Sequence, residues 1–187
     1  MNRFVTAALA AILLSATPVS AAQPAYAGGA TSTSLVGWGI LGWGSAVGVG
    51  ASIQLPLVPQ GLIHDPGFRL RDSLDLDLGV DYLSFWNHNY YYAGGPYYDV
   101  SQFNLHAGLI WNFWLTPRVA IYPKAGLGYS IATYTYSAGW DPIYGRGSYG
   151  GVYPELAAGA QLRLSNSLSL RGELGWSGLK VGLGFAF

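Results

Sequence analysis

The residues of this sequence best suited to chemistry are charged side chains that alternate with apolar ones. Asp75, Asp77 and Asp81 occupy one parity of the segment 74–82, and apolar residues occupy the other. Successive side chains of a β-strand point to opposite faces, so these three carboxylates would share one face of a strand. The same parity rule adds seven residues from later segments. The complete set is Asp75, Asp77, Asp81, His106, Lys124, Glu155, Arg163, Arg171, Glu173 and Lys180.

Two kinds of chemistry fit this set. If the shared face lines a narrow enclosed space, five acids and four bases can form an ion pathway or polar binding site, or they can pair into an electrostatic core. Buried charges are tolerated when they are paired, and the near balance of signs favours the paired core. Asp75 and Asp77 occupy adjacent inward positions and require a cationic partner. Three candidates are available: Arg163, Arg171 and Lys180.

Catalysis is disfavoured by the surroundings of the three histidines. A nucleophilic mechanism requires Ser or Thr beside a base, but no serine stands two positions after His64, His88 or His106, as it does in lipid A deacylases. A G-x-S-x-G elbow is absent, and two G-x-G-x-x-G matches, at 37–42 and 145–150, lack the strand–helix context of a dinucleotide site. We therefore expect no catalytic, cofactor-binding or metal-binding residue, and we expect His106 to be a hydrogen-bonding residue of the interior.

The composition excludes several classes of protein. Of the 187 residues, 10% are charged, whereas soluble domains have about 25%. A hydrophobic content of 51% is too high for a disordered chain. Nine basic and nine acidic residues give no basic field, so nucleic acid is not an expected partner. The absence of cysteine excludes a disulfide scaffold and a cysteine zinc site.

The first residues have the features of an export signal. Arg3 gives a basic start, residues 4–14 form an apolar run, and small residues lead to Ala21 and Ala22. We expect cleavage after one of these alanines, with 25–27 as a second cleavage site. The apolar run is too short for a transmembrane helix, which needs about 20 residues.

Period-two alternation predicts eight strands in the rest of the chain. They cover 35–43, 46–57, 74–82, 102–113, 119–131, 152–164, 168–176 and 179–187. Several have the length of about 9–11 residues with which a tilted strand crosses a bilayer. A helix over 35–53 is disfavoured, because each of its glycines costs about 1 kcal/mol relative to alanine. The expected organisation is a signal peptide at 1–22, a short N-terminal extension at 23–34 and one domain at 35–187.

The sequence also indicates which face of the strands points outward. The charges are too few to cover a surface in water, and the charged parity is rich in glycine, which suits a crowded interior. Aromatic residues cluster at strand ends, as in membrane-interface belts. We therefore predict an all-β protein, an eight-stranded antiparallel transmembrane β-barrel with its apolar side chains outward. This includes the first segment, where Val36, Trp38 and Ile40 alternate with Gly37 and Gly39.

At this point the chain resembles the small eight-stranded outer-membrane barrels, the class of OmpA-like, OmpX-like and opacity-type proteins. Its last strand ends Val181-x-Leu183-x-Phe185-x-Phe187, which is similar to the signal read by the barrel assembly machinery of that class. The resemblance implies a monomer in the bacterial outer membrane, surrounded by outer-membrane lipids and lipopolysaccharide. It also implies contact with the assembly machinery and periplasmic chaperones during biogenesis, with Phe185 and Phe187 as the assembly signal.

The connections between the predicted strands agree with this class, with one exception. The tight turns 115–118 and 165–167 would face the periplasm, and the longer loops 87–99 and 137–150, rich in Tyr and Gly, would face outside and could bind an external ligand. The exception is 58–72, a long connection on the side where the class has short turns. The expected function is a structural or surface-interaction role without catalysis. The alternatives are a small channel or transporter with a polar lumen and, less favoured, a lipid-modifying enzyme.

Overall fold

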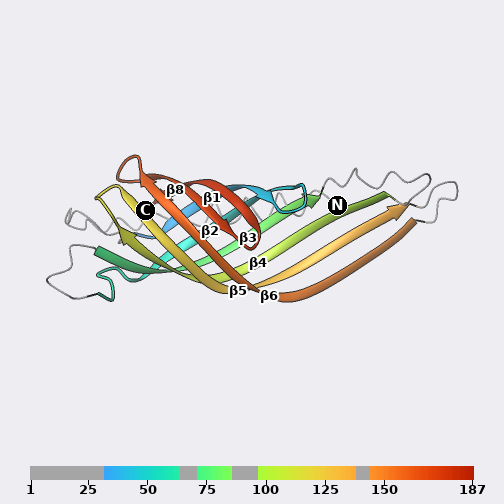
Figure 1. The fold of residues 1–187 in the computed structure, drawn as a ribbon, viewed down its shortest axis with the longest axis horizontal. Coiled ribbons are helices and arrows are strands. Elements are labelled where there is room, and N and C mark those ends of the chain that lie inside the picture. Colours follow the sequence, from blue (N-terminus) through green and yellow to red (C-terminus); the bar gives the residue numbers. More distant parts are fainter. Residues whose placement is uncertain (1–31, 64–70, 86–96, 138–143) are drawn as a thin grey trace.

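Eight antiparallel strands close into one barrel in the computed structural model, which describes residues 32–63, 71–85, 97–137 and 144–187. The strands are β1 (Ser34–Gly42), β2 (Ala46–Val58), β3 (Arg71–Phe85), β4 (Tyr97–Trp114), β5 (Val119–Ser137), β6 (Tyr144–Arg163), β7 (Leu168–Gly175) and β8 (Gly178–Ala186) (Figure 1). Each strand pairs with its neighbours in sequence. The predicted all-β, eight-stranded antiparallel barrel is confirmed. Within the described ranges, no helix is both long and apolar enough to span a bilayer.

The barrel closes between its first and last strands. The register of β1 and β8 runs from Ser34 opposite Ala186 to Leu41 opposite Leu179. At the end of this seam the Phe187 amide donates to the Thr33 carbonyl at 3.0 Å. The first two strands therefore lie where the alternation predicted them. The signal peptide, expected at 1–22, and most of the extension at 23–34 lie outside the described residues.

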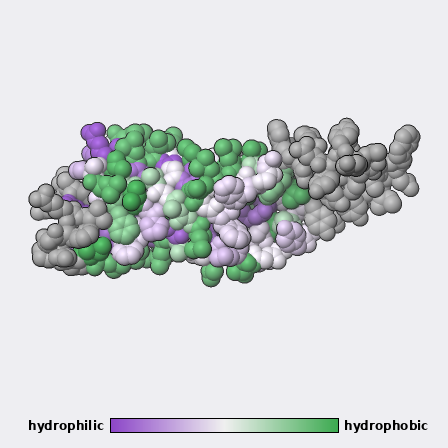
Figure 2. Space-filling view, in the orientation of Figure 1, coloured by the Kyte–Doolittle hydropathy of each residue, from purple (hydrophilic) through white to green (hydrophobic). Residues whose placement is uncertain are grey.

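Along β2 to β8 most of the large apolar side chains point outward, as predicted, with Leu83, Ile110 and Trp114 as buried exceptions. Leu105, Leu127 and Val152 are 46%, 64% and 72% exposed, and hydrophobic side chains cover much of the wall in Figure 2. The opposite parity points into the lumen, the interior of the barrel. The periodicity therefore predicted both the strands and their orientation over most of the chain.

The prediction of an apolar outward face is wrong for β1. Val36, Trp38 and Ile40 point into the lumen and pack with Ala46 and Leu83 in an apolar cluster, while Gly37 and Gly39 take outward positions. Trp38 fits inside because its cross-strand partners are glycines, Gly50 and Gly182. Its indole nitrogen donates to Ser52 Oγ at 3.1 Å. Because β1 has no charged residue, the alternation of glycine with larger apolar residues does not indicate which face of the strand points into the lumen.

Inward glycines make room for large side chains on neighbouring strands. One row across β2 to β6 reads Ser52, Gly79, His106, Gly128 and Tyr153. A Cβ atom at Gly79 would overlap the His106 ring, and one at Gly128 would overlap the Tyr153 ring. The glycine content of the inward parity is therefore a packing requirement of a narrow lumen.

The barrel has walls of unequal length. β4, β5 and β6 have 18, 19 and 20 residues, whereas β7 and β8 have 8 and 9. β6 pairs with β5 along Tyr144–Leu162 but with β7 only over Ala157–Arg163. The outer ends of β4–β6 therefore project past the β7–β8 turn (Figure 1).

The long strands change the predicted loops. Tyr97–Asp99 belong to β4 rather than to loop 87–99, and Tyr144–Gly150 belong to β6 rather than to loop 137–150. The remainder of both loops, 86–96 and 138–143, lies outside the described residues. The apolar–polar alternation is weak where tyrosine and glycine dominate, so the sequence did not reveal these extensions. In the structure, pairing with the neighbouring strand of the hairpin extends each strand.

The connection 58–72, which the resemblance did not explain, begins with a tight turn. The Gly61 amide donates to the Val58 carbonyl at 3.1 Å, and Gly61 has a φ of 80°, which glycine adopts without strain. The amides of Leu62 and Ile63 then donate to the Asp72 carboxylate at 2.8 and 3.2 Å. The antiparallel topology places this turn at the end of the barrel that contains the β1 start and the β8 end.

Candidate functional site

The candidate site is a cluster of charged side chains in the middle of the lumen. Strands β3 to β8 each contribute at least one member, and all are at most 5% exposed. This interior charge cluster consists of Asp77, Asp81, His106, Lys124, Glu155, Glu173 and Lys180. Their inward direction follows from strand parity, and the barrel closure brings them together.

Lys124 is the centre of the cluster. Its Nζ atom lies 2.8 Å from Asp77 Oδ2, 3.4 Å from Glu155 Oε1 and 3.7 Å from Glu173 Oε1. One ammonium group therefore joins carboxylates from three other strands. The expected pairing of Asp77 with Arg163, Arg171 or Lys180 is wrong. Lys124 reaches Asp77 across Gly108, where a side chain would crowd its methylene chain.

Lys180 forms the second ionic centre. Its Nζ atom lies 2.6 Å from Asp81 Oδ2, with hydrogen-bond geometry, and 3.9 Å from Glu155 Oε1. Glu155 thus lies between the two lysines and connects both centres. Four carboxylates share two lysines, and one oxygen of each carboxylate has no hydrogen-bond partner in the described part of the chain.

His106 lies between two carboxylates rather than beside a nucleophile. Its Nε2 atom is 3.4 Å from Asp77 Oδ2, and its Nδ1 atom is 3.7 Å from Asp81 Oδ2. Neither ring nitrogen makes a hydrogen bond to a described residue. The histidine occupies the interior, as expected, but its contacts are with the carboxylates of the charge cluster.

A second polar layer lies nearer the chain termini. The Arg171 guanidinium donates to Gln54 Oε1 and to Ser34 Oγ, the latter at 3.3 Å. Asp75 accepts a hydrogen bond from Asn112 Nδ2 at 2.8 Å, so its nearest partner is an amide.

Arg163 marks the terminal end of the lumen. It is half-buried, and its guanidinium carbon lies 4.2 Å from the centre of the Trp114 ring, in a cation–π arrangement. The ten residues selected from the sequence therefore divide into a central charge cluster, a polar layer and a basic end. Sequence spacing could not separate these three layers.

Several solved barrels have this fold. The chain is similar to a major outer membrane protein of Thermus thermophilus, with a TM-score of 0.58, 16% identity and coverage of 83% of this chain and 99% of that one. It is also similar to the N-terminal β-barrel domain of Pseudomonas aeruginosa OprF, with a TM-score of 0.54, 15% identity and coverage of 85% and 99%. The chain has the fold of the small eight-stranded outer-membrane barrels.

Other comparisons agree with this fold without narrowing it. Ail, the attachment invasion locus protein of Yersinia pestis, matches with a TM-score of 0.50, 13% identity and coverage of 83% of this chain and 99% of that one. No protein-family model matches the chain, and neither does any curated protein.

The lumen also contains polar residues that the sequence analysis did not include among its ten candidates. Gln54, Asn112 and Ser34 lie on inward parities, and an extension of the parity rule from charged to amide and hydroxyl side chains would have found them. Asp72 is different, because it joins the turn after β2 to β4. It accepts from Leu62 and Ile63 and from the Trp111 indole at 2.7 Å. No local pattern in the sequence indicated these contacts.

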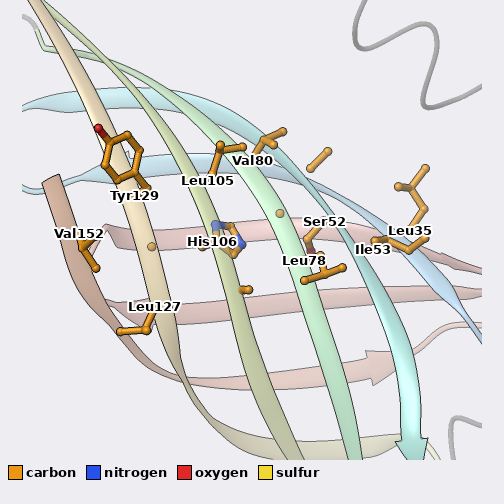
Figure 3. Close-up of a pocket in the computed structure, with 14 residues that line it drawn as sticks. Leu35, Ser52, Ile53, Leu78, Val80, Leu105, His106, Leu127, Tyr129 and Val152 are labelled. Carbon is orange, nitrogen blue, oxygen red and sulfur yellow. The ribbon is translucent and has the colours of Figure 1, made fainter. Parts of the chain in front are cut away.

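The outer wall of the barrel has a shallow apolar furrow of about 600 Å³. Leu78, Leu105 and Leu127 line it, together with Gly79 and Gly128, and Figure 3 shows the labelled side chains around it. Most of its lining side chains belong to the outward parity, and Ser52 and His106 of the inward parity also line it. The furrow is a gap between rows of apolar side chains. Within the described residues, no group of His, Asp or Glu is arranged to hold a metal ion.

Proposed function

We propose that this protein is an integral β-barrel protein of the bacterial outer membrane, with a structural or surface-interaction role and no catalytic activity. The observation that carries this proposal is the separation of its side chains. Apolar residues cover the outside of β2 to β8, and most of the described charged residues of the same strands are buried inside. A large exposed apolar surface on a folded protein is characteristic of contact with a membrane or a partner.

The closed hydrogen-bond network supports a membrane environment. A barrel leaves no backbone group unpaired in hydrocarbon, whereas an open sheet leaves an edge. The pairing of β1 with β8 removes that edge over the short wall. β1 and β8 have 9 residues each, which matches the 9–11 residues that a tilted strand needs to cross a bilayer.

Aromatic side chains at both ends of the short wall support the same placement. Trp43 and Trp176, in the β1–β2 and β7–β8 turns, are each 61% exposed. Phe185 and Phe187, at the opposite end, are 57% and 45% exposed. Trp and Tyr are enriched at membrane–water interfaces, and aromatic girdles flank the apolar band of outer-membrane barrels. The two phenylalanines are also the residues proposed as the signal for the barrel assembly machinery.

A spin-label experiment tests the proposal directly. The chain has no cysteine, so Leu76→Cys and Leu105→Cys each provide one labelling position on the outer wall. In vesicles we expect both labels to be reached by oxygen dissolved in the lipid and shielded from a water-soluble nickel reagent. Ser177→Cys, in the outer β7–β8 turn, should show the opposite pattern. Water-accessible labels at positions 76 and 105 would refute the membrane barrel.

A small channel is the second candidate, because the interior charge cluster contains carboxylate oxygens without partners among the described residues. Lys124 and Lys180 instead form ion pairs with carboxylates of several strands, which favours a closed lumen. The interior of an eight-stranded barrel is only wide enough to be filled by side chains. In planar bilayers we expect no unitary conductance from the refolded protein. A reproducible conductance that Asp77→Asn abolishes would favour the channel.

The biological setting is proposed on the same basis. We propose export by a signal peptide at 1–22, a monomeric barrel surrounded by outer-membrane lipids and lipopolysaccharide, and periplasmic chaperones as partners before insertion. Surface interaction is assigned to the projecting outer ends of β4–β6 and to the predicted loops 87–99 and 137–150. Mass spectrometry of lipid A from cells with and without the protein tests the absence of lipid-modifying activity, and we expect identical profiles.

A further inference from the structure

The outer mouth of the barrel contains a cavity distinct from the interior charge cluster. This rim pocket has a volume of about 350 Å³ and lies between the inner face of β4–β6 and the two short outer turns. Its aromatic lining residues are Trp43, Phe85, Tyr149, Tyr153 and Trp176. The volume is at the lower end of the range for small-molecule sites, about 300–1,000 Å³.

The lining of the rim pocket combines aromatic rings with amide and hydroxyl groups. Gln102 and Asn104 are on the β4 side, where Gln102 Nε2 donates to Asn104 Oδ1 at 2.8 Å. Ser130 and Ser177 add hydroxyl groups. None of the described residues that line the pocket carries a formal charge. The nearest inward carboxylate on β3, Asp81, is 1% exposed and is held by Lys180.

This lining selects among ligand classes. A charged ligand would lose hydration and find no counter-charge among the described lining residues, which is unfavourable. A hydrocarbon chain would fill the space beside Gln102 and Asn104 and leave polar groups of the pocket unpaired, which also costs free energy. A neutral sugar has apolar C–H faces and hydroxyl edges, so it can stack on an aromatic ring and hydrogen-bond to amides at the same time.

We propose that the rim pocket binds a neutral saccharide unit. Trp176 and Tyr149, 61% and 67% exposed, provide aromatic rings for stacking, and Gln102 and Asn104 provide amide groups for the sugar hydroxyls. This proposal deepens the surface-interaction role and rests on it, because the pocket opens at the end of the barrel that would face outside.

The test measures sugar binding to the refolded full barrel. The protein is prepared in an amine-oxide detergent, which has no sugar headgroup, and maltose, lactose and cellobiose are titrated while the amide and indole signals are followed by NMR. We expect saturable shifts of the Gln102 and Asn104 side-chain amides with at least one disaccharide. Trp176→Leu should weaken binding about tenfold, as for an aromatic anchor. Phe103→Leu, on the outward face of β4, should leave it unchanged.

Two controls separate the outcomes. Glucuronate and octane represent a charged sugar and an acyl chain, and saturation by either of them without saturation by a neutral sugar would overturn the proposal. Equal affinities of the Trp176→Leu and Phe103→Leu variants would overturn it as well. Each variant is first tested for the change in gel mobility on boiling that folded outer-membrane barrels show. A protein with this change and no sugar binding contradicts the saccharide site alone, whereas a protein without it contradicts the membrane barrel.

Discussion

At the residue scale, a few lysines and glycines decide how the interior of this barrel is filled. Lys124 contacts three carboxylates from different strands, and Lys180 contacts two. Removal of one partner from a buried ionic cluster leaves uncompensated charge, which is far more damaging than loss of a surface pair. Glycines such as Gly128 are equally specific, because they accommodate the ring of a neighbouring residue.

Lys124→Met should strongly destabilise the barrel. The substitution leaves Asp77, Glu155 and Glu173 without their shared cation, and breaking a buried pair costs about 3–5 kcal/mol. Urea unfolding of the protein in vesicles measures the change in the free energy of unfolding. The matched control is Arg118→Met in the exposed β4–β5 turn, which should change it by less than about 0.5 kcal/mol. Equal effects of the two substitutions would show that the cluster does not stabilise the fold.

Gly128→Ala should destabilise the barrel through overpacking against Tyr153. Extra atoms in a packed core cost about 1–3 kcal/mol. Gly172→Ala is the control, because nothing lies within 4 Å of its added Cβ atom. In the double variant with Tyr153→Ala, the cost of the alanine at position 128 should largely disappear, since the obstructing ring is gone. Additive effects in the same unfolding assay would contradict the proposed packing.

At the scale of elements, the unequal strands divide the barrel into a membrane-spanning part and a projecting part. The short strands β1, β7 and β8 have no residues beyond those needed to span a bilayer, whereas β6 continues for more than ten residues beyond its pairing with β7. Beyond the Leu156 carbonyl, which accepts from the Trp176 amide, that part of β6 pairs with no described strand on its β7 side, and hydrocarbon would not tolerate an unpaired edge. The outer ends of β4–β6 therefore belong in the aqueous region outside the membrane.

A charge scan along the wall tests this division. Leu183→Arg places a charge in the middle of β8 and should lower the free energy of unfolding by about 2–4 kcal/mol, as at the bilayer midplane. Ser148→Arg places the same charge on the projecting part of β6 and should cost about 0–1 kcal/mol. A similar cost at both positions would place the outer end of β6 inside the membrane.

At the scale of the whole molecule, closure of the barrel is the event that creates the interior. The charge cluster draws on six consecutive strands, and the polar layer joins β1 and β2 to β7 through Arg171, Ser34 and Gln54. The contacts of Arg171 on β7 with Ser34 and Gln54, and of Lys180 on β8 with Asp81 on β3, join the two halves of the chain that closure brings together. The lumen and the seam are therefore parts of one cooperative structure.

A disulfide across the seam tests closure and register together. Leu35 lies opposite Phe185, so Leu35→Cys with Phe185→Cys should form a disulfide on oxidation in the folded barrel. The boiled, non-reduced protein would then migrate as a looped chain, because the link joins its first and last strands. Leu35→Cys with Leu179→Cys, at opposite ends of the seam, should not form one. Cross-linking of the second pair as readily as the first would contradict the register.

The alternation of apolar and polar residues in the sequence was sufficient to predict the number of strands and most of their bounds. Period two is a local property, so a single segment such as 168–176 reveals its two faces without its neighbours. Charges then indicated which face is inside wherever a strand has them, as Asp75 and Asp77 do on β3. β1 has no charge, and its inward Trp38 was predicted to face outward. The glycines opposite Trp38 that accommodate it come from β2 and β8, far away in the sequence.

The contacts between side chains of different strands were decided by the register of the strands and by closure of the barrel. Both depend on how strands far apart in the sequence are aligned. The partner of Asp77 is Lys124 rather than a residue of β7 or β8, since Gly108 leaves a path between them. Strand alignment also determines three other features. These are the hydrogen bonds of Asp72 to the turn after β2, the length of the β4–β6 wall, and the rim pocket. A repeat of two residues specifies the face of each side chain. Only the closed barrel specifies which side chains from different strands meet.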